Sequence, residues 1–335
     1  MTIESSAKRP RAFTMIELLV TMSIIGIVIA ITLPAVQSVR ESARVTHCQA
    51  NLRQFGLAAQ NFHSTHRMFP SGGWGYQWQG FSDIGPASRQ PGSWTFSLLP
   101  FLEQQDLYEI GRYHTPSEVR DAALRLRMQT SVPLHSCPTR RDGSLLPVSC
   151  DECGDVIGLQ GKIEMVVRGD YAANSGDGAP DAYDLSNWPL DFSGPVDLRE
   201  AAEMDRLGHW PRMPSDFTGI SYLRYGSSAA DVTDGLSHTL LYGEKYIDAA
   251  CYQSGLDWGD NEPLYGGFNN DNHRSTHPAW LLMQDRPGLM SIGSFGSAHP
   301  SGANFVLCDG SVRLVGYSID TETYRKMGNR RDSRR

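Results

Sequence analysis

Hydrophobic residues are concentrated in one block near the N-terminus. The 22 residues from 18 to 39 carry no charge, and as a helix rising about 1.5 Å per residue they would span roughly 30 Å, one bilayer hydrocarbon core. The polar segment before them contains Lys8, Arg9 and Arg11. Because basic residues beside a span stay in the cytoplasm, the pattern predicts one membrane span with a cytoplasmic N-terminus.

A helical pattern continues beyond the uncharged block. Apolar side chains from Leu52 to Phe62 recur at spacings of three, four and three residues, as on one face of a helix. The first interruption rich in Gly and Pro is FPSGGWG at 69–75. We therefore expect one N-terminal helix over 13–66, with its transmembrane part at 13–36 and its second half packed on a globular domain.

From residue 67 to 322 the pattern predicts one extracytoplasmic domain with short elements. Helices are expected after Pro100 and from Pro116, where Pro and acidic residues open the first turn. Strands are expected within 165–176, 236–246 and 302–317. In the last of these, Asp309 and Gly310 separate two apolar runs and predict a β-hairpin. Without alternating βα units, the fold class is α+β: a long helix, then an antiparallel sheet with elaborated loops.

Composition and charge narrow the function classes. The chain has 335 residues and a net charge of −7, and this acidic balance argues against nucleic acid as a partner because phosphate binding needs a basic face. The last residues, 323–335, are basic with little apolar content, so they are predicted to form a disordered tail.

Three interpretations of the N-terminal block compete. A secretory signal peptide would have a shorter apolar region followed by a small-residue cleavage site, whereas this block continues past Pro34. A simple anchor fits the length but leaves Glu17 unexplained, unless its carboxylate snorkels to the lipid headgroups. An acidic group near hydrocarbon is costly and usually has a partner.

The third interpretation is a resemblance. The segment RPRAFTMIELLV resembles the processing site of type IV prepilins and type II secretion pseudopilins. In that family a prepilin peptidase removes a short basic leader before a Phe, the new amino group is methylated, and a Glu stands fifth in the mature chain. The resemblance implies removal of residues 1–12 between Ala12 and Phe13, and it places Glu17 fifth. The family usually has Gly where this chain has Ala12.

The resemblance also implies a location and a role. The protein would span the inner (cytoplasmic) membrane once, with its C-terminal domain periplasmic or extracellular, as a structural subunit or minor component of a type II secretion or type IV pilus-like assembly. Its partners would be prepilin peptidase, other pilin-like subunits and the lipid bilayer. Glu17 would neutralise the Phe13 amine of a neighbouring subunit, since paired charges avoid most of the desolvation cost. The alternative is a membrane-displayed binding module that uses the anchor without polymerising.

The C-terminal part carries a second resemblance. His299, nine residues and then Asp309-Gly310 resemble the C-terminal signature of a large, functionally uncharacterised family of prepilin-like proteins. Further blocks that resemble this family lie at 48–63, 98–108, 137–138, 171–178 and 231–244. Together they cover nearly the whole chain and imply a pilin-like fold.

Few residues suggest chemistry. His299 and Asp309 invite a catalytic or metal interpretation, but we favour a structural one in which Asp309-Gly310 shapes a turn and His299 bonds nearby backbone. No G-x-S-x-G or H-E-x-x-H motif is present, so no enzyme is predicted. His273 and His277 have helical metal spacing but lie in a loop-like segment. No metal or cofactor is predicted, although calcium in the oxygen-rich loop 257–272 remains an alternative to a solvated loop.

The cysteines become candidates for bridges once the domain is placed outside the cytoplasm. Cys150 and Cys153 are predicted to form a local disulfide, because no second C-x-x-C completes a zinc site. Cys48 and Cys137 lie in family-like blocks and would pair as a staple between helix and domain, worth about 4 kcal/mol by chain entropy. The sequence leaves fifteen full pairings open.

Aromatic residues cluster in the Gly-rich stretch that follows the long helix. Trp74, Trp78 and Trp94 lie there with Tyr76. If they are exposed, they would form a surface for sugars or partners; we favour burial in the core.

Overall fold

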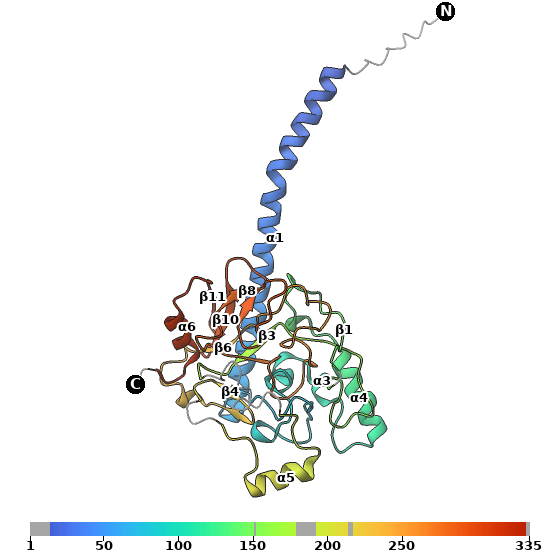
Figure 1. Cartoon of the computed structure of the whole chain (residues 1–335), viewed down its shortest axis with the longest axis vertical. Helices are drawn as coiled ribbons and strands as arrows, with labels where there is room; N and C mark the ends of the chain where they lie inside the picture. Colours follow the sequence, from blue (N-terminus) through green and yellow to red (C-terminus); the bar gives the residue numbers. More distant parts are fainter. Residues whose placement is uncertain (1–13, 151, 179–191, 214–216, 333–335) are drawn as a thin grey trace, which may run out of the picture. The chain divides into compact units, whose positions relative to one another are not determined.

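The computed structural model describes residues 14–150, 152–178, 192–213 and 217–332. Helix α1 (Met15–His66) opens the chain (Figure 1). The chain divides into two compact units, residues 1–44 and residues 45–335. The predicted cleavage site at Ala12 and Phe13 lies outside the described residues.

The first half of α1 is apolar and exposed. Its 18 most apolar residues have no buried side chain within the structure, and α1 is long and apolar enough to cross a membrane. Pro34 lies inside the helix without ending it. Glu17 is exposed, and its Oε2 accepts hydrogen bonds from the backbone N and the Oγ1 of Thr14 at 2.9 and 2.8 Å. This carboxylate therefore satisfies donors at the free start of the helix.

The second unit contains several short helices, as its turn-rich sequence predicts. The α-helices are α2 (Trp94–Ser97), α3 (Gln105–Glu109), α4 (Ser117–Gln129), α5 (Leu198–Leu207) and α6 (Thr321–Gly328). The 3₁₀ turns are η1 (Ala87–Arg89), η2 (Leu99–Leu102), η3 (Pro133–His135) and η6 (Ala229–Asp231). The helices expected after Pro100 and Pro116 are confirmed as α3 and α4. Asp197 is the N-cap of α5, and its side chain accepts hydrogen bonds from the backbone N–H groups of Arg199 and Glu200.

A five-stranded sheet is the centre of this unit. It contains β3 (Tyr171–Asn174), β6 (Leu240–Glu244), β7 (His273–Arg274), β10 (Ala303–Leu307) and β11 (Val312–Val315), in the order β11-β10-β6-β3-β7. All neighbours are antiparallel except β3 and β7, which run parallel. The α+β fold class is confirmed, and β7 is the one departure from an antiparallel sheet.

Three two-stranded ladders complete the described strands. They are β1 (Leu146–Pro147) with β2 (Met165–Val166), β4 (Ser221–Tyr222) with β5 (Tyr225–Gly226), and the parallel pair β8 (Met283–Gln284) with β9 (Gly296–Ser297). The predicted hairpin is confirmed, because β10 and β11 pair from Ala303 opposite Val315 to Val306 opposite Val312. Short ladders of this kind hold the long loops in place.

The second half of α1 packs into the core beside the sheet (Figure 1). Phe55 is fully buried, with its ring 5.4 Å from the rings of both Trp94 and Tyr171. Burying one such side chain contributes about 1.5–3 kcal/mol. Trp74, Trp78 and Trp94 are at most 4% exposed. The structure therefore confirms that these three indoles lie in the core.

The basic C-terminal segment is ordered where the structure describes it. Residues 321–328 form α6. Arg330 is fully buried, donates to the carbonyl of Gly219 and lies 5.0 Å from the centre of the Phe217 ring. Arg325 pairs with Asp177, Glu322 and Asp332. The prediction of a disordered tail is wrong over 323–332, because ion pairs and a cation–π contact engage its basic side chains.

At Gly56 the helix α1 lies close to the β10–β11 hairpin. A Cβ added there would lie 2.6 Å from Val306 Cγ2 and 3.2 Å from Gly310 Cα. Helix propensity alone favours Ala over Gly by about 1 kcal/mol, whereas overpacking costs about 1–3 kcal/mol. We expect Gly56→Ala to lower the melting temperature of the full chain, measured in detergent by circular dichroism.

Gly26 provides the matched control within the same helix. A Cβ added at Gly26 meets nothing within 4 Å, so Gly26→Ala should leave the melting temperature of the domain unchanged. A melting temperature for Gly56→Ala at or above that of the wild type would contradict the packing described here.

Candidate functional site

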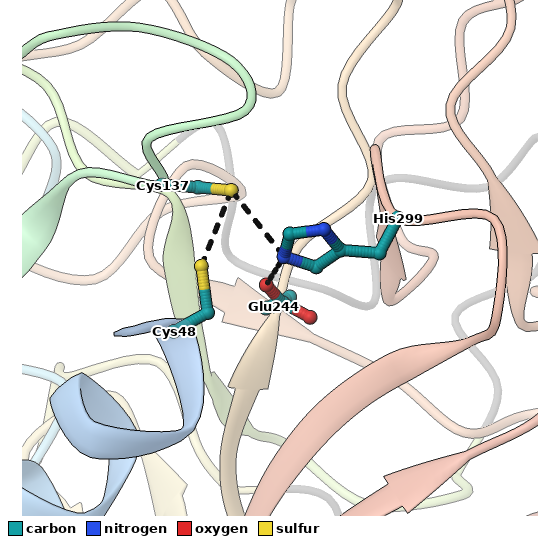
Figure 2. Close-up of side chains that lie close together, drawn as sticks. All are labelled: Cys48, Cys137, Glu244 and His299. Carbon is teal, nitrogen blue, oxygen red and sulfur yellow. Dashed lines mark hydrogen bonds and ion pairs between the residues drawn. The ribbon is translucent and has the colours of Figure 1, made fainter. Parts of the chain in front are cut away.

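Four side chains from distant parts of the chain converge in the core of the second unit (Figure 2). Cys48 lies on α1, Cys137 follows η3, Glu244 ends β6, and His299 follows β9. All four are fully buried, and one N, O or S atom from each lies within 4.8 Å of those of the others. We call these four residues the core cluster.

The core cluster is a chain of close polar contacts. The Sγ atoms of Cys48 and Cys137 are 3.3 Å apart. Cys137 Sγ lies 3.7 Å from His299 Nε2, and His299 Nε2 lies 3.3 Å from Glu244 Oε1. Figure 2 shows these side chains pointing toward one another. Buried polar groups of this kind persist only where they satisfy one another or a bound ion.

Neighbouring groups fix the orientation of the core cluster. Glu244 Oε2 accepts hydrogen bonds from the backbone N and the side-chain Nδ2 of Asn304, at 2.7 and 3.0 Å. His299 Nδ1 lies 3.5 Å from Thr139 Oγ1. The backbone N of Cys137 donates to Asp170 at 2.6 Å. These contacts leave Glu244 Oε1 and His299 Nε2 facing the two sulfurs.

Polar contacts shift the pKa of three members of the core cluster, His299, Cys137 and Cys48. Burial lowers the pKa of His299, but its contacts with Cys137 and Glu244 outweigh burial and raise that pKa above its ordinary value. The hydrogen bond from Cys48 lowers the pKa of Cys137, while the same contact and burial raise the pKa of Cys48. The polar contacts within the cluster, together with burial, thus determine the direction of each pKa shift.

A network of buried ion pairs holds the loop that follows Cys137. Arg140 pairs with Asp285 at 2.7 Å. Arg141 contacts Asp170 at 2.7 Å and Asp260 at 2.6 Å, and Lys245 reaches Asp260 at 2.9 Å. All these side chains are at most 2% exposed. Breaking one such pair leaves an uncompensated buried charge, so the network holds Cys137 and Glu244 in place.

The structure separates the two candidate residues of the C-terminal signature. Asp309 Oδ1 accepts from the backbone N and Oγ of Ser311 at 2.8 and 2.6 Å, and Gly310 has a positive φ of 84°. These residues shape the hairpin turn, as expected. The ring of His299 contacts Glu244 and Cys137, and the expectation that His299 hydrogen-bonds nearby backbone stays a prediction.

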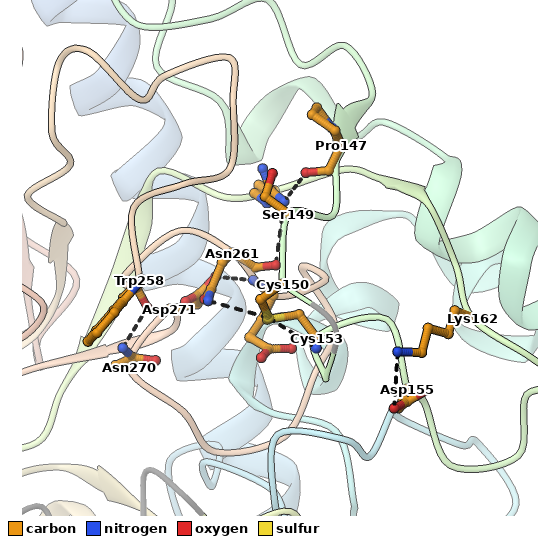
Figure 3. Close-up of a disulfide and its surroundings, with 12 residues drawn as sticks. Pro147, Ser149, Cys150, Cys153, Asp155, Lys162, Trp258, Asn261, Asn270 and Asp271 are labelled. Atoms are coloured by element: carbon orange, nitrogen blue, oxygen red, sulfur yellow. Dashed lines mark hydrogen bonds and ion pairs between the residues drawn. A yellow bond between two sulfur atoms is a disulfide. The ribbon is translucent and has the colours of Figure 1, made fainter.

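The cysteines occupy three kinds of environment. Cys150 and Cys153 form a disulfide (Figure 3), as predicted. Cys48 and Cys137 are free thiols that face each other, so the pairing that the family resemblance implies is seen as a contact without a bond. Cys251 and Cys308 are buried free thiols.

The oxygen-rich loop 257–272 is not the solvated loop that we expected. Asp257, Asp260 and Asp271 are at most 7% exposed. Asp260 contacts Arg141 and Lys245, and the oxygens of Asp257 accept from the backbone N of Asp248 and Gly259. These donors already engage carboxylate oxygens that calcium would need, so the residues do not fit a calcium site.

His273 and His277 also have local roles. The His273 ring is buried and contacts Asn272 and Ser221. His277 Nδ1 accepts from the backbone N of Ala279 at 3.1 Å. The structure does not bring the two rings into a common metal site.

A cavity of about 320 Å³ opens beside the disulfide. Aromatic, amide and acidic side chains line it, among them Tyr76, Trp258, Asn261, Glu262 and Asn270. Trp258 is 67% exposed, and its carbonyl accepts from Asn270 Nδ2 at 2.6 Å (Figure 3). Sequence reasoning missed Trp258, because only the folded chain distinguishes it from the buried indoles.

Sequence reasoning also missed Glu244 and the grouping around it. One signal was available: Glu244 is an acidic residue at the end of the apolar run LLYGE. A charged residue in a buried strand normally has a partner. The identity of that partner depends on strand pairing that the sequence alone does not specify.

Comparisons with known proteins agree with this architecture. Residues 7–33 match the prokaryotic N-terminal methylation motif. Together with the long apolar helix and the α+β domain, the motif defines a pilin- or pseudopilin-like protein with a single-pass membrane anchor. Residues 37–322 match the family described as protein of unknown function (DUF1559), and the chain belongs to that family. No curated protein and no solved structure matches the chain significantly.

The buried acids beside the ion-pair network generate a pH prediction. Burial raises the pKa of Asp271 to about 6, with Asp260 adding to the rise and Lys245 opposing it. Because the folded state holds this proton more tightly than the unfolded state, the stabilisation is complete below about pH 4 and is lost as the pH rises through 6. The loss is at most about 3 kcal/mol.

Asp271→Asn should remove this loss, because the amide stays neutral and its oxygen still accepts from the backbone N of Glu262, as Asp271 Oδ2 does at 2.7 Å. We expect the melting temperature of the variant, minus that of the wild type, to increase as the pH rises from 4.5 to 7.5. Glu164→Gln, at an exposed position, is the charge-matched control. A difference between Asp271→Asn and wild type that is constant across this range would refute the assignment.

Proposed function

We propose that this protein is a membrane-anchored structural subunit, or a minor component, of a type II secretion or type IV pilus-like assembly. The observation that carries the proposal is the methylation motif at 7–33 on a helix whose first half is apolar and exposed. An apolar surface this long requires lipid or other helices around it. When a subunit leaves the bilayer, a bundle of identical helices would cover this apolar surface in place of lipid.

Glu17 is the residue that makes assembly specific in this proposal. Its carboxylate is exposed at the start of an apolar helix, with Thr14 as its hydrogen-bonding neighbour. Removal of residues 1–12 by prepilin peptidase would create a cationic amine on Phe13. Pairing that amine with Glu17 of a neighbouring subunit would neutralise both charges within the apolar bundle.

The protein would have a defined location and orientation in the membrane. Lys8, Arg9 and Arg11 precede the span, so the N-terminus would be cytoplasmic and the C-terminal domain periplasmic or extracellular, with the anchor in the inner membrane. The disulfide between Cys150 and Cys153 suits an oxidising compartment. The His299-nine residues-Asp309-Gly310 signature would serve the domain's structure rather than catalysis, and the proposed role is not enzymatic.

Glu17→Ala tests the polymer. We expect the variant to be cleaved and anchored like the wild type, with mass spectrometry showing a methylated Phe13 N-terminus. Its crosslinking to other pilin-like subunits in membranes should fall at least about tenfold, because one unpaired buried charge costs more than about 1.4 kcal/mol. Glu41→Ala, farther along the same helix, is the control.

Two outcomes would count against the proposal. An intact Met1 in the membrane-purified protein would exclude the prepilin route. Undiminished crosslinking of Glu17→Ala would exclude assembly through this charge and favour the alternative.

The alternative is a membrane-displayed binding module that does not polymerise. The 320 Å³ cavity beside the disulfide favours it, because an exposed aromatic face next to amides and a carboxylate suits a sugar ring. In this alternative Trp258→Ala would weaken binding to envelope polysaccharide at least about tenfold in a pull-down assay, by loss of roughly 1.4 kcal/mol or more of contact.

Leu256→Ala is the matched control for that experiment. Leu256 is 56% exposed and close in sequence, but it is not among the residues lining the cavity. Equal binding by wild type and Trp258→Ala would remove the support that this cavity lends to a binding module.

A further inference from the structure

We propose that the core cluster, Cys48, Cys137, Glu244 and His299, is a structural site for one Zn²⁺ ion that fastens the second half of α1 to the sheet domain. The four residues offer two sulfurs, one imidazole nitrogen and one carboxylate oxygen. These are the ligand types of tetrahedral zinc sites, and four protein ligands make a closed, structural site.

The spacing of the ligand atoms supports a tetrahedral centre. With metal–ligand distances of about 2.3 Å for sulfur and about 2.0–2.2 Å for nitrogen and oxygen, the edges of a tetrahedron are roughly 3.4–3.8 Å. The structure has 3.3 Å between the sulfurs, 3.7 Å from Cys137 Sγ to His299 Nε2, and 3.3 Å from that nitrogen to Glu244 Oε1. The other three separations among these ligand atoms are within 4.8 Å, so contraction of the cluster around one ion would complete the coordination.

The second observation is the state of Glu244. Its Oε2 accepts two hydrogen bonds from Asn304, whereas its fully buried Oε1 lies 3.3 Å from His299 Nε2, within the cluster of ligand atoms. Metal-binding carboxylates are commonly held in this way, with one oxygen fixed by the protein and the other on the ion.

His299 has the matching arrangement. Its Nδ1 lies within hydrogen-bonding distance of Thr139 Oγ1, at 3.5 Å, so a proton on Nδ1 would leave the Nε2 lone pair for the metal. Hydrogen bonds to the outer nitrogen orient metal-binding histidines in this way. His299 would bind as neutral imidazole, and both cysteines would bind as thiolates after releasing their protons.

Zinc accounts for the whole core cluster, whereas a disulfide accounts for half of it. A bond between Cys48 and Cys137 would leave His299 and Glu244 as a buried pair beside two sulfurs. Zinc uses all four groups, and its charge offsets two of the three anionic ligands. The Arg140 guanidinium, which acts electrostatically on Cys137 and Glu244, would partly offset the third. Calcium prefers oxygen ligands only, so the two thiols select a softer ion.

The test uses the full-length protein purified from membranes in detergent without reductant. We expect elemental analysis to find about one zinc per chain, and four thiols to react after chelation and denaturation, because Cys150 and Cys153 are already bonded. Replacement by Co²⁺ should give the visible absorption of tetrahedral cobalt and a sulfur-to-metal charge-transfer band. Chelation should lower the melting temperature by on the order of 10 °C.

Variants identify the ligands. Cys137→Ser and His299→Ala should each lose the zinc or its cobalt spectrum. Cys308→Ser, at a buried free thiol outside the cluster, should keep both. Because substitution of a buried ligand can also prevent folding, the metal content, thiol count and cobalt spectrum of the wild type are the primary measurements.

Two results would overturn the proposal. Two reactive thiols together with a mass lower by two hydrogens would show a disulfide between Cys48 and Cys137 instead. Four reactive thiols with no zinc bound after incubation with micromolar Zn²⁺ would show an unmetallated cluster. Neither result depends on whether the protein assembles through Glu17.

Discussion

The packing of residues 45–66 of α1 against the five-stranded sheet is the interaction on which the second unit depends. Phe55 lies among Trp94, Tyr171 and Tyr242, and Gly56 admits the β10–β11 hairpin to within van der Waals contact. Aromatic rings around a helix contribute burial and favourable edge contacts together. Tyr171 of β3, Tyr242 of β6 and Val306 of β10 share one buried cluster with this helix segment, so the sheet and the helix form a common core.

The C-terminal signature contacts the same helix at two levels. His299 reaches the cluster that contains Cys48, while the turn at Gly310 lies against Gly56 and the carbonyl of Cys308 accepts from Gln60 Nε2. Twelve residues of helix separate Cys48 from Gln60, roughly 18 Å at 1.5 Å per residue. The segment from His299 to Gly310 thus contacts the helix at two points more than three turns apart. This geometry gives a structural reason for the nine residues between His299 and Asp309.

The buried charges around this contact are costly unless each is paired. Arg140, Arg141 and Lys245 find partners in Asp170, Asp260 and Asp285. A buried network of this kind adds little net stability over apolar packing, but it penalises any arrangement that leaves one member unpaired. In a domain whose loops greatly exceed its strands in length, such penalties select one arrangement of the loops and bring Cys137 to Glu244.

Local sequence patterns were enough to predict the apolar helix with Glu17 at its start, the α+β class, the helices after Pro100 and Pro116, and the hairpin at Asp309-Gly310. Each follows from spacing or turn chemistry within about 20 residues. No local pattern predicted that His299 faces Glu244, that Trp258 is exposed while Trp78 is buried, or that Arg330 lies in the core. Those outcomes depend on contacts between segments far apart in the chain, such as that of Arg330 with Gly219, and strand pairing and loop packing set these contacts.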